Sequence, residues 1–246
     1  MIITMVYVLL ELTAHTQAQY KDIVYSQNNI VELTNSSLSM FDLLEVSLVK
    51  CGSVCLLNQC CKEFLYSRHN QRCIGVHFAD FQSTSAIIPL AFSSFEGMLA
   101  YQKGCENGWL KFNGHCYRKS SSKTTWANAK LECQKMCSYL VEIESKEESG
   151  WLATTFLDNA NCRSDPFFDC TAWTGGNDLD TEGQYKWDHS NTLMSFTNWH
   201  YHEPSLGNPN QALNRDCIDM LRDGVWNDRP CSYLNSVICE KSFNKK

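Results

Sequence analysis

Residues 198–231 read NWHYHEPSLGNPNQALNRDCIDMLRDGVWNDRPC, and this stretch determines how the rest of the chain is interpreted. It begins as a polar loop that is poor in apolar residues and contains the tripeptide Glu203-Pro204-Ser205. A short apolar run, Cys217 to Leu221, and the segment Gly224 to Asp228 then lead to a second cysteine, Cys231. The cysteine pair can fix loop against strand beside four oxygen-bearing side chains: Glu203, Ser205, Asn227 and Asp228. Clusters of carboxylate and amide oxygens of this kind bind hard cations and sugar hydroxyls.

Composition narrows the class of protein. The chain has 246 residues, which is room for two domains of ordinary size, and its apolar content of 43% is enough for a folded core. A net charge of -6 argues against a nucleic-acid partner held by neutralised phosphates. The 14 cysteines indicate an oxidising compartment and disulfide bonds. Zinc is the rival explanation, but the sequence contains no Cys-x-x-Cys pair, the spacing that most zinc ribbons and fingers use.

The N-terminus indicates secretion. An apolar run, Ile2 to Leu10, precedes a Thr16-Gln17-Ala18 stretch that can be cleaved after Ala18, so residues 1–18 are predicted to be a signal peptide. No Lys or Arg precedes the run, and the alternative is a buried first strand. The run is too short to span a bilayer, and no other segment is long and apolar enough to do so. We therefore expect a secreted protein that does not span a membrane, glycosylated at the single sequon, Asn35.

Residues 19–103 form the first predicted domain. Apolar residues recur at helical spacing from Phe41 to Leu57, and Cys51 and Cys55 lie four apart on the same helical face. Two short strands, 63–66 and 73–78, follow across a polar turn. The simplest arrangement joins helix to hairpin through Cys51–Cys73 and Cys55–Cys61, although the sequence leaves the connectivity open and gives Cys60 no obvious partner. Residues 80–101 are apolar with scattered Ser and Gly, and we expect them to supply closing strands.

This region resembles a PAN/apple module. The resemblance is carried by Cys51, Cys55, Cys61, Phe64, Tyr66 and Cys73. It implies a module that binds protein or carbohydrate without catalysis. The alternative is any other small α+β domain held by disulfides.

A second domain is predicted from Gly104 to Lys241, with a tail at 242–246. Asn113-Gly114 is a strong hairpin turn signal. Thr124 to Cys137 has the apolar spacing of a helix behind a Ser/Thr-rich N-cap. A second helix is predicted from Ser145, where Ser145 and Glu148 match a capping box.

Short strands are expected over the rest of the domain, at 171–174, 185–187, 217–221, 224–226 and 236–240. Cys162 and Cys170 are close enough to close a local loop, while Cys137 has three candidate partners: Cys60, Cys162 and Cys170. The long irregular stretch between Trp187 and Cys217 needs a functional reason or disorder to explain it. The tryptophans and the cysteine that flank it favour an ordered loop.

Together these motifs resemble a C-type lectin-like domain over residues 105–241. The resemblance is carried by the cysteines and by Trp173-Thr174-Gly175-Gly176, Glu203-Pro204-Ser205, Trp226-Asn227-Asp228 and Val237-Ile238-Cys239-Glu240. It implies an α+β fold with two helices, antiparallel sheets and a long loop. It also implies the pairs Cys133–Cys239, Cys217–Cys231 and Cys105–Cys116.

The resemblance further implies a calcium-dependent sugar site. A primary calcium would be held by Glu203, Asn227 and Asp228, with Ser205 at the remaining loop position, and these residues would also bind the sugar hydroxyls. A Glu-Pro-Asn tripeptide in this position goes with mannose-type sugars, and Gln-Pro-Asp with galactose-type sugars. The chain departs from the pattern at Ser205 and at Arg215, which stands where an acidic ligand is usual.

Arg215 puts calcium binding in question, because a guanidinium repels a divalent ion and can itself pair with Glu203 or Asp228. Asn208, Asn210 or Asn214 can act as substitutes if the loop shifts the alignment. An auxiliary calcium site is implied at Asp178, Glu182 and Asp216, for which solvated surface charge is the alternative.

Other chemistries are less well supported by the sequence. His200 and His202 suggest zinc but lack clear third and fourth ligands. Asp188, His189 and Ser190 are merely adjacent, and no nucleophile-elbow pattern occurs, so we do not expect an enzyme. Trp199 and Tyr201 are placed to stack on a ligand.

The prediction is therefore a secreted carbohydrate-binding lectin whose partners are glycans or glycoproteins and whose cofactor is calcium. The alternative is a calcium-independent lectin-like domain that binds a protein or matrix partner.

Overall fold

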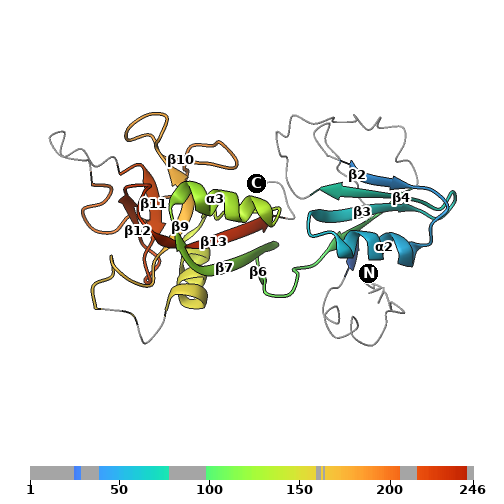
Figure 1. Cartoon of the computed structure of the whole chain (residues 1–246), viewed down its shortest axis with the longest axis horizontal. Helices are drawn as coiled ribbons and strands as arrows, with labels where there is room; N and C mark the ends of the chain where they lie inside the picture. Colours follow the sequence, from blue (N-terminus) through green and yellow to red (C-terminus); the bar gives the residue numbers. More distant parts are fainter. Residues whose placement is uncertain are drawn as a thin grey trace. The chain divides into compact units, whose positions relative to one another are not determined.

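The computed structural model of the chain describes residues 25–28, 39–77, 98–158, 162, 164–205 and 215–242. The expected signal peptide, the Asn35 sequon and the three candidate substitute ligands (Asn208, Asn210 and Asn214) lie outside the described residues. The chain divides into two compact units with a boundary between Trp109 and Leu110 (Figure 1). Within the described ranges, no helix has the length and apolar character needed to cross a membrane.

The N-terminal unit contains a five-stranded sheet with the strand order β1-β5-β3-β4-β2. Its strands are β1 (Tyr25–Asn28), β2 (Ser39–Leu43), β3 (Cys61–Ser67), β4 (Arg72–His77) and β5 (Leu99–Lys103). Helix α2 (Leu48–Leu57) packs against β3 and β4 (Figure 1). Two disulfides hold it there, Cys51–Cys73 and Cys55–Cys61, which is the simplest arrangement expected from the sequence.

The helix begins later than the apolar spacing predicted. Ser47 is the N-cap of α2, and its Oγ accepts a hydrogen bond from the Lys50 N–H at 3.2 Å. Residues 39–43 belong instead to β2, where Phe41 pairs with Gly75 of β4. A β-carbon at position 75 would collide with the Phe41 ring, so the glycine allows this close approach. The predicted helix start at Phe41 is therefore wrong, because pairing with β4 overrides the helical periodicity.

The C-terminal unit is built on an eight-stranded sheet ordered β12-β11-β9-β13-β7-β6, with β10 paired to β9 and β8 to β13. The strands are β6 (Leu110–Phe112), β7 (His115–Thr124), β8 (Tyr139–Leu140), β9 (Ala172–Asn177), β10 (Lys186–Trp187), β11 (Cys217–Met220), β12 (Trp226–Arg229) and β13 (Asn235–Ser242). Strands β9 and β13 run parallel, whereas β11 is antiparallel to both β9 and β12. The α+β fold with antiparallel pairing is as predicted.

Two turns in this unit have backbone conformations that suit their residues. Asn113 and Gly114 have φ of 44° and 84°, as a two-residue turn between β6 and β7 requires. Gly224 has φ of 87°, and its N–H donates to the Leu221 carbonyl at 2.9 Å. Because residues 221–224 form this turn, the last strand before Cys231 starts at Trp226, not at Gly224 as expected.

Both predicted helices of this unit form. Helix α3 (Trp126–Lys135) starts after Thr125, whose side chain makes no capping hydrogen bond. Helix α4 (Lys146–Leu152) starts after Ser145, whose Oγ accepts from the Glu148 N–H at 3.1 Å, and continues as a π-helical turn, η2 (Ala153–Leu157). One bond differs from a standard capping box, in which the Glu148 side chain would accept from the N–H of Ser145. Here Glu148 Oε2 accepts from the N–H of Glu144.

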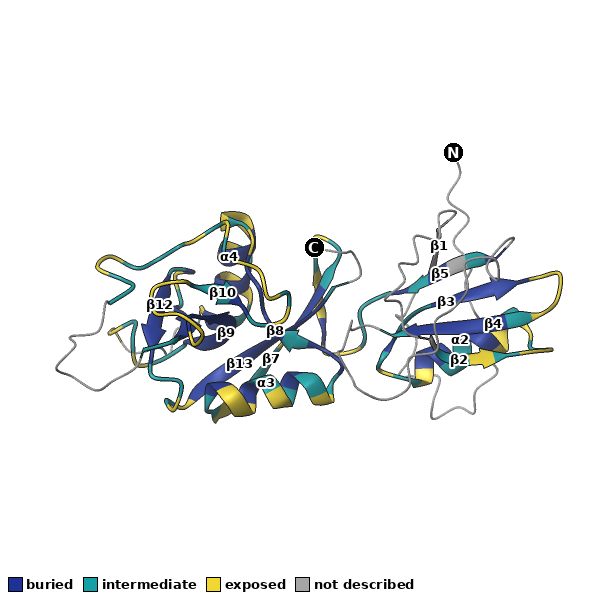
Figure 2. Cartoon of the chain, turned by 90° about the horizontal axis from the view of Figure 1, so that it is seen from above, coloured by how far each residue is buried: buried dark blue, intermediate teal, exposed yellow. Residues whose placement is uncertain are grey.

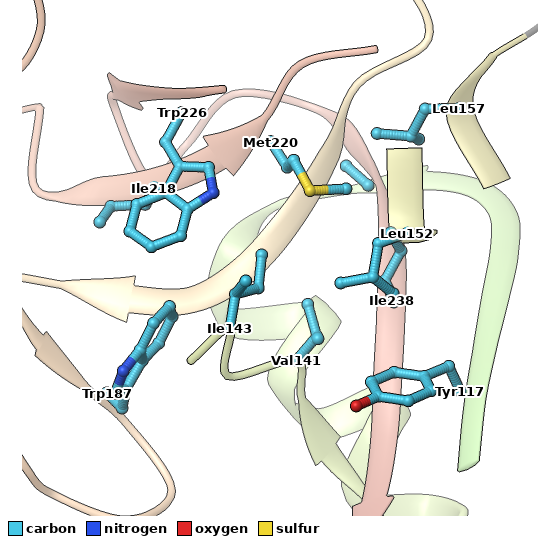
Figure 3. Packing of buried hydrophobic residues seen from close by; sticks show 11 residues of the cluster. Tyr117, Val141, Ile143, Leu152, Leu157, Trp187, Ile218, Met220, Trp226 and Ile238 are labelled. Atoms are coloured by element: carbon cyan, nitrogen blue, oxygen red, sulfur yellow. The ribbon is translucent and has the colours of Figure 1, made fainter. Parts of the chain in front are cut away.

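The core of the C-terminal unit is aromatic and aliphatic and is shared by helix α4, the turn η2 and the sheet. Figure 3 shows Trp187, Trp226 and Ile218 beside Ile143, and Leu152 beside Ile238. Strands β9 and β13 are buried along almost their whole length, whereas the outer face of α3 is exposed (Figure 2). The sheet edge formed by β11 and β12 is therefore fixed from beneath by the core.

Disulfides add to this core. Cys133 pairs with Cys239, Cys217 with Cys231 and Cys162 with Cys170. The first pair has a sequence separation of 106 residues, and closing a loop of that size contributes about 4.7 kcal/mol in the chain-entropy model. Cys60, Cys105, Cys116 and Cys137 are also disulfide-bonded. The expected pair Cys105–Cys116 stays a prediction.

Candidate functional site

The loop that contains Glu203 is attached to the start of β12. The Trp226 N–H donates to the Asn198 carbonyl at 2.7 Å, and the His200 N–H donates to the Trp226 carbonyl at 2.8 Å. These two backbone bonds carry the loop alongside the strand that holds Asn227 and Asp228. Residues that are more than 20 positions apart in sequence are thereby brought to one edge of the sheet.

The loop tryptophan, Trp199, is partly buried and packs against the core. The Trp199 ring packs edge-on against Tyr185 and Trp226, with centroid distances of 4.8 Å and 6.0 Å. These contacts orient the Trp199 ring, and its expected stacking on a ligand stays a prediction. Tyr201, in contrast, is 78% exposed and lies against the ring of the exposed His202.

Three of the predicted site residues meet at this edge. The peptide bond between Glu203 and Pro204 is cis. The Ser205 N–H donates to Glu203 Oε2 at 2.7 Å, and the Ser205 hydroxyl donates to Asp228 Oδ1 at 2.6 Å. Ser205 thus links the two carboxylates, one from the loop and one from β12.

Asp228 is the electrostatic centre of this group. Its side chain is buried, and burial raises its pKa to about 6; the nearby Glu203 carboxylate acts in the same direction, while the Ser205 hydroxyl opposes the change. The nearest described cation is Arg215, whose Nη1 lies 4.0 Å from Asp228 Oδ1. Of the two partners considered for Arg215, the structure brings it to Asp228, at the outer limit of an ion pair.

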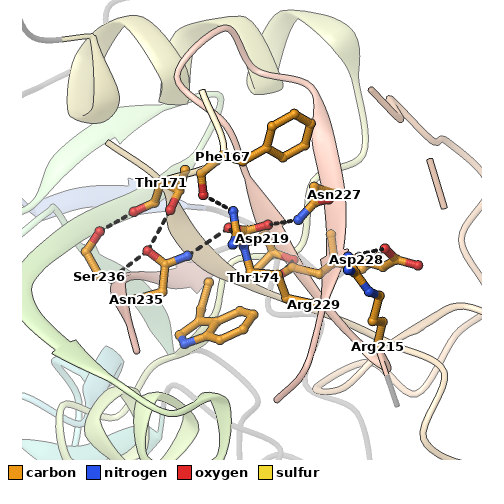
Figure 4. A network of polar contacts seen from close by, with 12 residues as sticks. Phe167, Thr171, Thr174, Arg215, Asp219, Asn227, Asp228, Arg229, Asn235 and Ser236 are labelled. Carbon is orange, nitrogen blue, oxygen red and sulfur yellow. Dashed lines mark hydrogen bonds and ion pairs between the residues drawn. The ribbon is translucent and has the colours of Figure 1, made fainter. Parts of the chain in front are cut away.

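Asn227 is anchored from within the chain through its side-chain nitrogen, and its expected role as a ligand stays a prediction. Its side chain is buried, and its Nδ2 donates to Asp219 Oδ1 at 2.9 Å, one strand away on β11 (Figure 4). Asp219 was not predicted as part of the site. The only signal for it in the sequence is a charged residue inside the apolar run from Cys217 to Leu221.

The second acidic group lies next to the first. The Asp178 N–H donates to the Asp216 carbonyl at 3.0 Å, and the Gly183 N–H donates to Asp178 Oδ2 at 2.8 Å. Asp178 Oδ1 is buried and has no hydrogen-bond partner among the described residues. An orphaned carboxylate oxygen of this kind is unfavourable unless a cation or water satisfies it.

The pKa values of these acids show that they share one electrostatic neighbourhood. Burial, followed by the charge of Asp228, raises the pKa of Asp178, and burial with the charges of Asp178 and Asp228 raises that of Asp216. The charge of Asp178 is the main cause of the raised pKa of the exposed Glu182. A cation bound among these four carboxylates would stabilise the ionised form of each.

The donor set fits calcium. Glu203, Asp228, Asn227 and Ser205 offer carboxylate, amide and hydroxyl oxygens, and calcium takes six to eight oxygen ligands of these kinds. The unpartnered Asp178 Oδ1 and the mutual rise of the carboxyl pKa values agree with a cation in the auxiliary position. Arg215 is the feature that opposes a cation at Asp228.

The C-terminal part of the chain is similar to known proteins. The family profile described as the Lectin C-type domain matches residues 122–241. The hepatic lectin of Gallus gallus is 33% identical over 155 residues, which are 63% of this chain and 68% of that protein. This chain belongs to the C-type lectin domain family. The resemblance predicted from the sequence is therefore confirmed for this domain.

Solved C-type lectin domains also match the chain. The mouse scavenger receptor C-type lectin carbohydrate-recognition domain is 29% identical, with a TM-score of 0.49, over 56% of this chain and 98% of that one. The cow carbohydrate-recognition domain of CD23, solved in the presence of a GlcNAc2Man3 oligosaccharide, is 31% identical. Its TM-score is 0.47, over 56% of this chain and 96% of that one.

The residues considered for catalysis have other roles in this C-type lectin domain. Asp188 Oδ1 accepts from Lys130 Nζ at 2.8 Å, and the N–H groups of His189 and Ser190 both donate to Glu142 Oε1 at 2.9 Å. The Ser190 hydroxyl is 2.8 Å from that of Thr192. These contacts order the loop after β10.

Proposed function

We propose that this chain is a lectin that binds glycans at Glu203, Ser205, Asn227 and Asp228 in a calcium-dependent manner. The observation that carries the proposal is the pairing of the Glu203 and Asp228 carboxylates through Ser205 at an edge of the sheet. The family supports carbohydrate binding, and domains of this family commonly bind calcium.

Each site residue has a role that follows from its chemistry. Glu203 and Asp228 supply carboxylate oxygens that accept hydrogen bonds from sugar hydroxyls and hold the cation. Bound calcium supplies direct coordination of two sugar oxygens and neutralises the paired carboxylates. Ser205 keeps the two carboxylates together through the bonds that its N–H and hydroxyl donate.

An auxiliary cation at Asp178, Glu182 and Asp216 is part of the same proposal. It is supported by the buried, unpartnered Asp178 Oδ1 and by the raised pKa values of all three carboxyl groups. Such a cation stabilises the segment between β9 and β10, which lies beside Asp228 through Tyr185: the Tyr185 hydroxyl donates to Asp228 Oδ2 at 3.4 Å.

A second candidate function is calcium-independent binding of a protein or matrix partner. It is favoured by Arg215, whose guanidinium approaches Asp228 at 4.0 Å, and by the Ser205 hydroxyl bound to the same carboxylate oxygen. Without calcium, Asp228 has its hydrogen-bond donor and its positive charge from Ser205 and Arg215 of the same chain.

For the N-terminal region, residues 19–103, we propose a PAN/apple-like binding module. Helix α2, held to the β3–β4 hairpin by Cys51–Cys73 and Cys55–Cys61, supports it. Secretion, removal of residues 1–18 and glycosylation at Asn35 complete the proposal, and they agree with the disulfide-rich composition. We expect no catalysis, with binding as the function of both domains.

A glycan array probed in calcium and again in EDTA tests the main proposal, with Asp228→Asn as the matched control because it keeps the side-chain shape. The proposal predicts glycan binding in calcium that is lost in EDTA and lost in the variant. Equal glycan binding in both buffers contradicts the calcium dependence but not the binding of glycans. No glycan binding in either buffer contradicts the lectin proposal.

A further inference from the structure

Asp219 is a fully buried carboxylate that faces the site from beneath. It lies in β11 directly opposite Asn227 of β12 in the antiparallel register, and its side chain is 0% exposed. Its Oδ1 accepts from Asn227 Nδ2 at 2.9 Å. Its Oδ2 accepts from Arg229 Nε at 2.6 Å and from Asn235 Nδ2 at 3.0 Å (Figure 4). Three N–H donors thus converge on one buried carboxylate.

The partners of Asp219 are themselves fixed. Arg229 also donates through Nη2 to the Phe167 carbonyl. The side-chain oxygen Oδ1 of Asn235 accepts from the Thr171 hydroxyl at 2.8 Å and from the Ser236 N–H at 2.9 Å. Because Arg229 and Asn235 each have a second bond, to the loop before β9 or to β13, Asp219 has little freedom to move.

This arrangement constrains the orientation of the Asn227 amide. An ionised carboxylate only accepts hydrogen bonds, whereas an amide has a donor end and an acceptor end. If the Asn227 amide were turned over, its oxygen would face Asp219 Oδ1 in a buried setting, and two acceptors would oppose each other. Asn227 must therefore point its nitrogen at Asp219, which directs its Oδ1 elsewhere.

We infer that Asp219 is a positioning residue of the ligand site: it holds the Asn227 amide in the orientation that leaves Oδ1 available to a bound cation or a sugar hydroxyl. The inference rests on the proposed function, in which Asn227 is a site ligand. Asp219 itself touches neither cation nor sugar and acts only through Asn227.

The test compares two variants that damage the same buried network. Asp219→Asn removes the acceptor-only side chain, so the Asn227 amide is able to turn over. Arg229→Lys keeps the positive charge beside Asp219 but loses the fork that reaches both Asp219 and Phe167, and it leaves the Asn227–Asp219 bond in place. Thermal melts measure the shared loss of stability, and calcium titration measures the site.

We expect both variants to lower the melting temperature, but only Asp219→Asn to weaken calcium binding, by about tenfold, as is common for residues that orient a metal ligand. The double variant Asp219→Asn with Asn227→Asp should recover the affinity, because both ends of a carboxylate are oxygens and its orientation no longer matters. If Asp219 had a purely structural role, the two single variants would weaken calcium binding equally, and the double variant would not recover the affinity. Either result overturns the inference.

A calcium-free readout separates this inference from the proposed function. In the wild-type protein, the Asn227 side-chain NH₂ should give one NMR signal pair with one proton protected from exchange, assigned by its absence in Asn227→Asp. If the wild type does not bind calcium but its Asn227 amide is protected, the proposed function is refuted and the orientation of Asn227 by Asp219 is not. An unprotected Asn227 amide in the wild type refutes the positioning role, even where Asp219→Asn fails to fold.

Discussion

Asp228 has a raised pKa, and the sign of its effect on stability depends on calcium. In the folded, calcium-free protein, burial raises the pKa of Asp228 to about 6 from an ordinary value of 3.8. The folded state then binds the proton more tightly than the unfolded state, so this group contributes stability below about pH 4 that is lost as the pH rises through about 6. The contribution is at most about 3 kcal/mol.

We therefore predict that the stability of the protein depends on pH in opposite directions with and without calcium. In EDTA, the melting temperature should rise from pH 7 to pH 5, and Asp228→Asn should melt higher than the wild type at pH 7 and show a weaker pH dependence. In calcium, the added stability should disappear as the pH falls through about 6, because protonated Asp228 no longer binds the ion. Differential scanning calorimetry across this range checks both slopes, and identical slopes in the wild type and the variant would refute the role of Asp228.

Arg215 is the residue most at odds with a cation at Asp228. Two unit charges 4.0 Å apart interact by about 4 kcal/mol near a protein surface, but the Arg215 side chain is 38% exposed, so solvent screening leaves roughly 1 kcal/mol. Arg215→Gln is predicted to tighten calcium binding about fivefold, while Arg215→Lys, which keeps the charge, leaves it nearly unchanged. Calcium titration calorimetry measures both; equal affinities for the two variants would mean that the charge of Arg215 does not reach the site.

At the residue scale, the sequence predicted some site contacts and missed others for a physical reason. Glu203, Ser205 and Asp228 come together because the loop and β12 carry them in recognisable motifs. Asp219 escaped prediction because its role depends on its register opposite Asn227, which a single strand pattern does not reveal. The contacts of Trp199 with Tyr185 and Trp226 were not predicted because they are tertiary.

At the scale of single elements, helix α4 offers a test of its predicted start. Ser145 caps the helix through its bond from the Glu148 N–H, whereas Thr125, at the same position of α3, makes no side-chain capping bond. We predict that Ser145→Ala lowers the free energy of unfolding by about 1 kcal/mol, and that Thr125→Ala changes it by only a few tenths. Denaturant unfolding compares the two, and equal losses would contradict the cap assignment.

Cysteine spacing and turn residues predicted several elements well. Cys51 and Cys55 lie four apart on one face of α2, so both can reach the β3–β4 hairpin, as the observed pairs do. Apolar spacing alone could not separate β2 from α2, because a short apolar segment fits either period. Pairing of Phe41 with Gly75 decided it, and that contact joins residues 34 positions apart.

At the scale of the whole molecule, the two units have separate hydrophobic cores. One surrounds Phe64, Tyr66 and Tyr101, and the other surrounds Trp187 and Trp226. A ligand stabilises only the unit that binds it, by about 2.7 kcal/mol at a concentration 100 times its dissociation constant. Calorimetry of the full chain should therefore show two transitions, of which calcium raises one; a rise of both together would count against a calcium site confined to residues 110–241.

The proposed calcium-dependent sugar site at Glu203, Ser205 and Asp228 is tested most directly by isothermal titration calorimetry with a mannose-type oligosaccharide. This sugar is chosen because Glu203-Pro204 matches the first two residues of the Glu-Pro-Asn tripeptide that goes with such sugars. The full chain should bind the sugar in calcium, and binding should vanish in EDTA and in Asp228→Asn. Sugar binding that persists unchanged in EDTA or in Asp228→Asn would contradict the account.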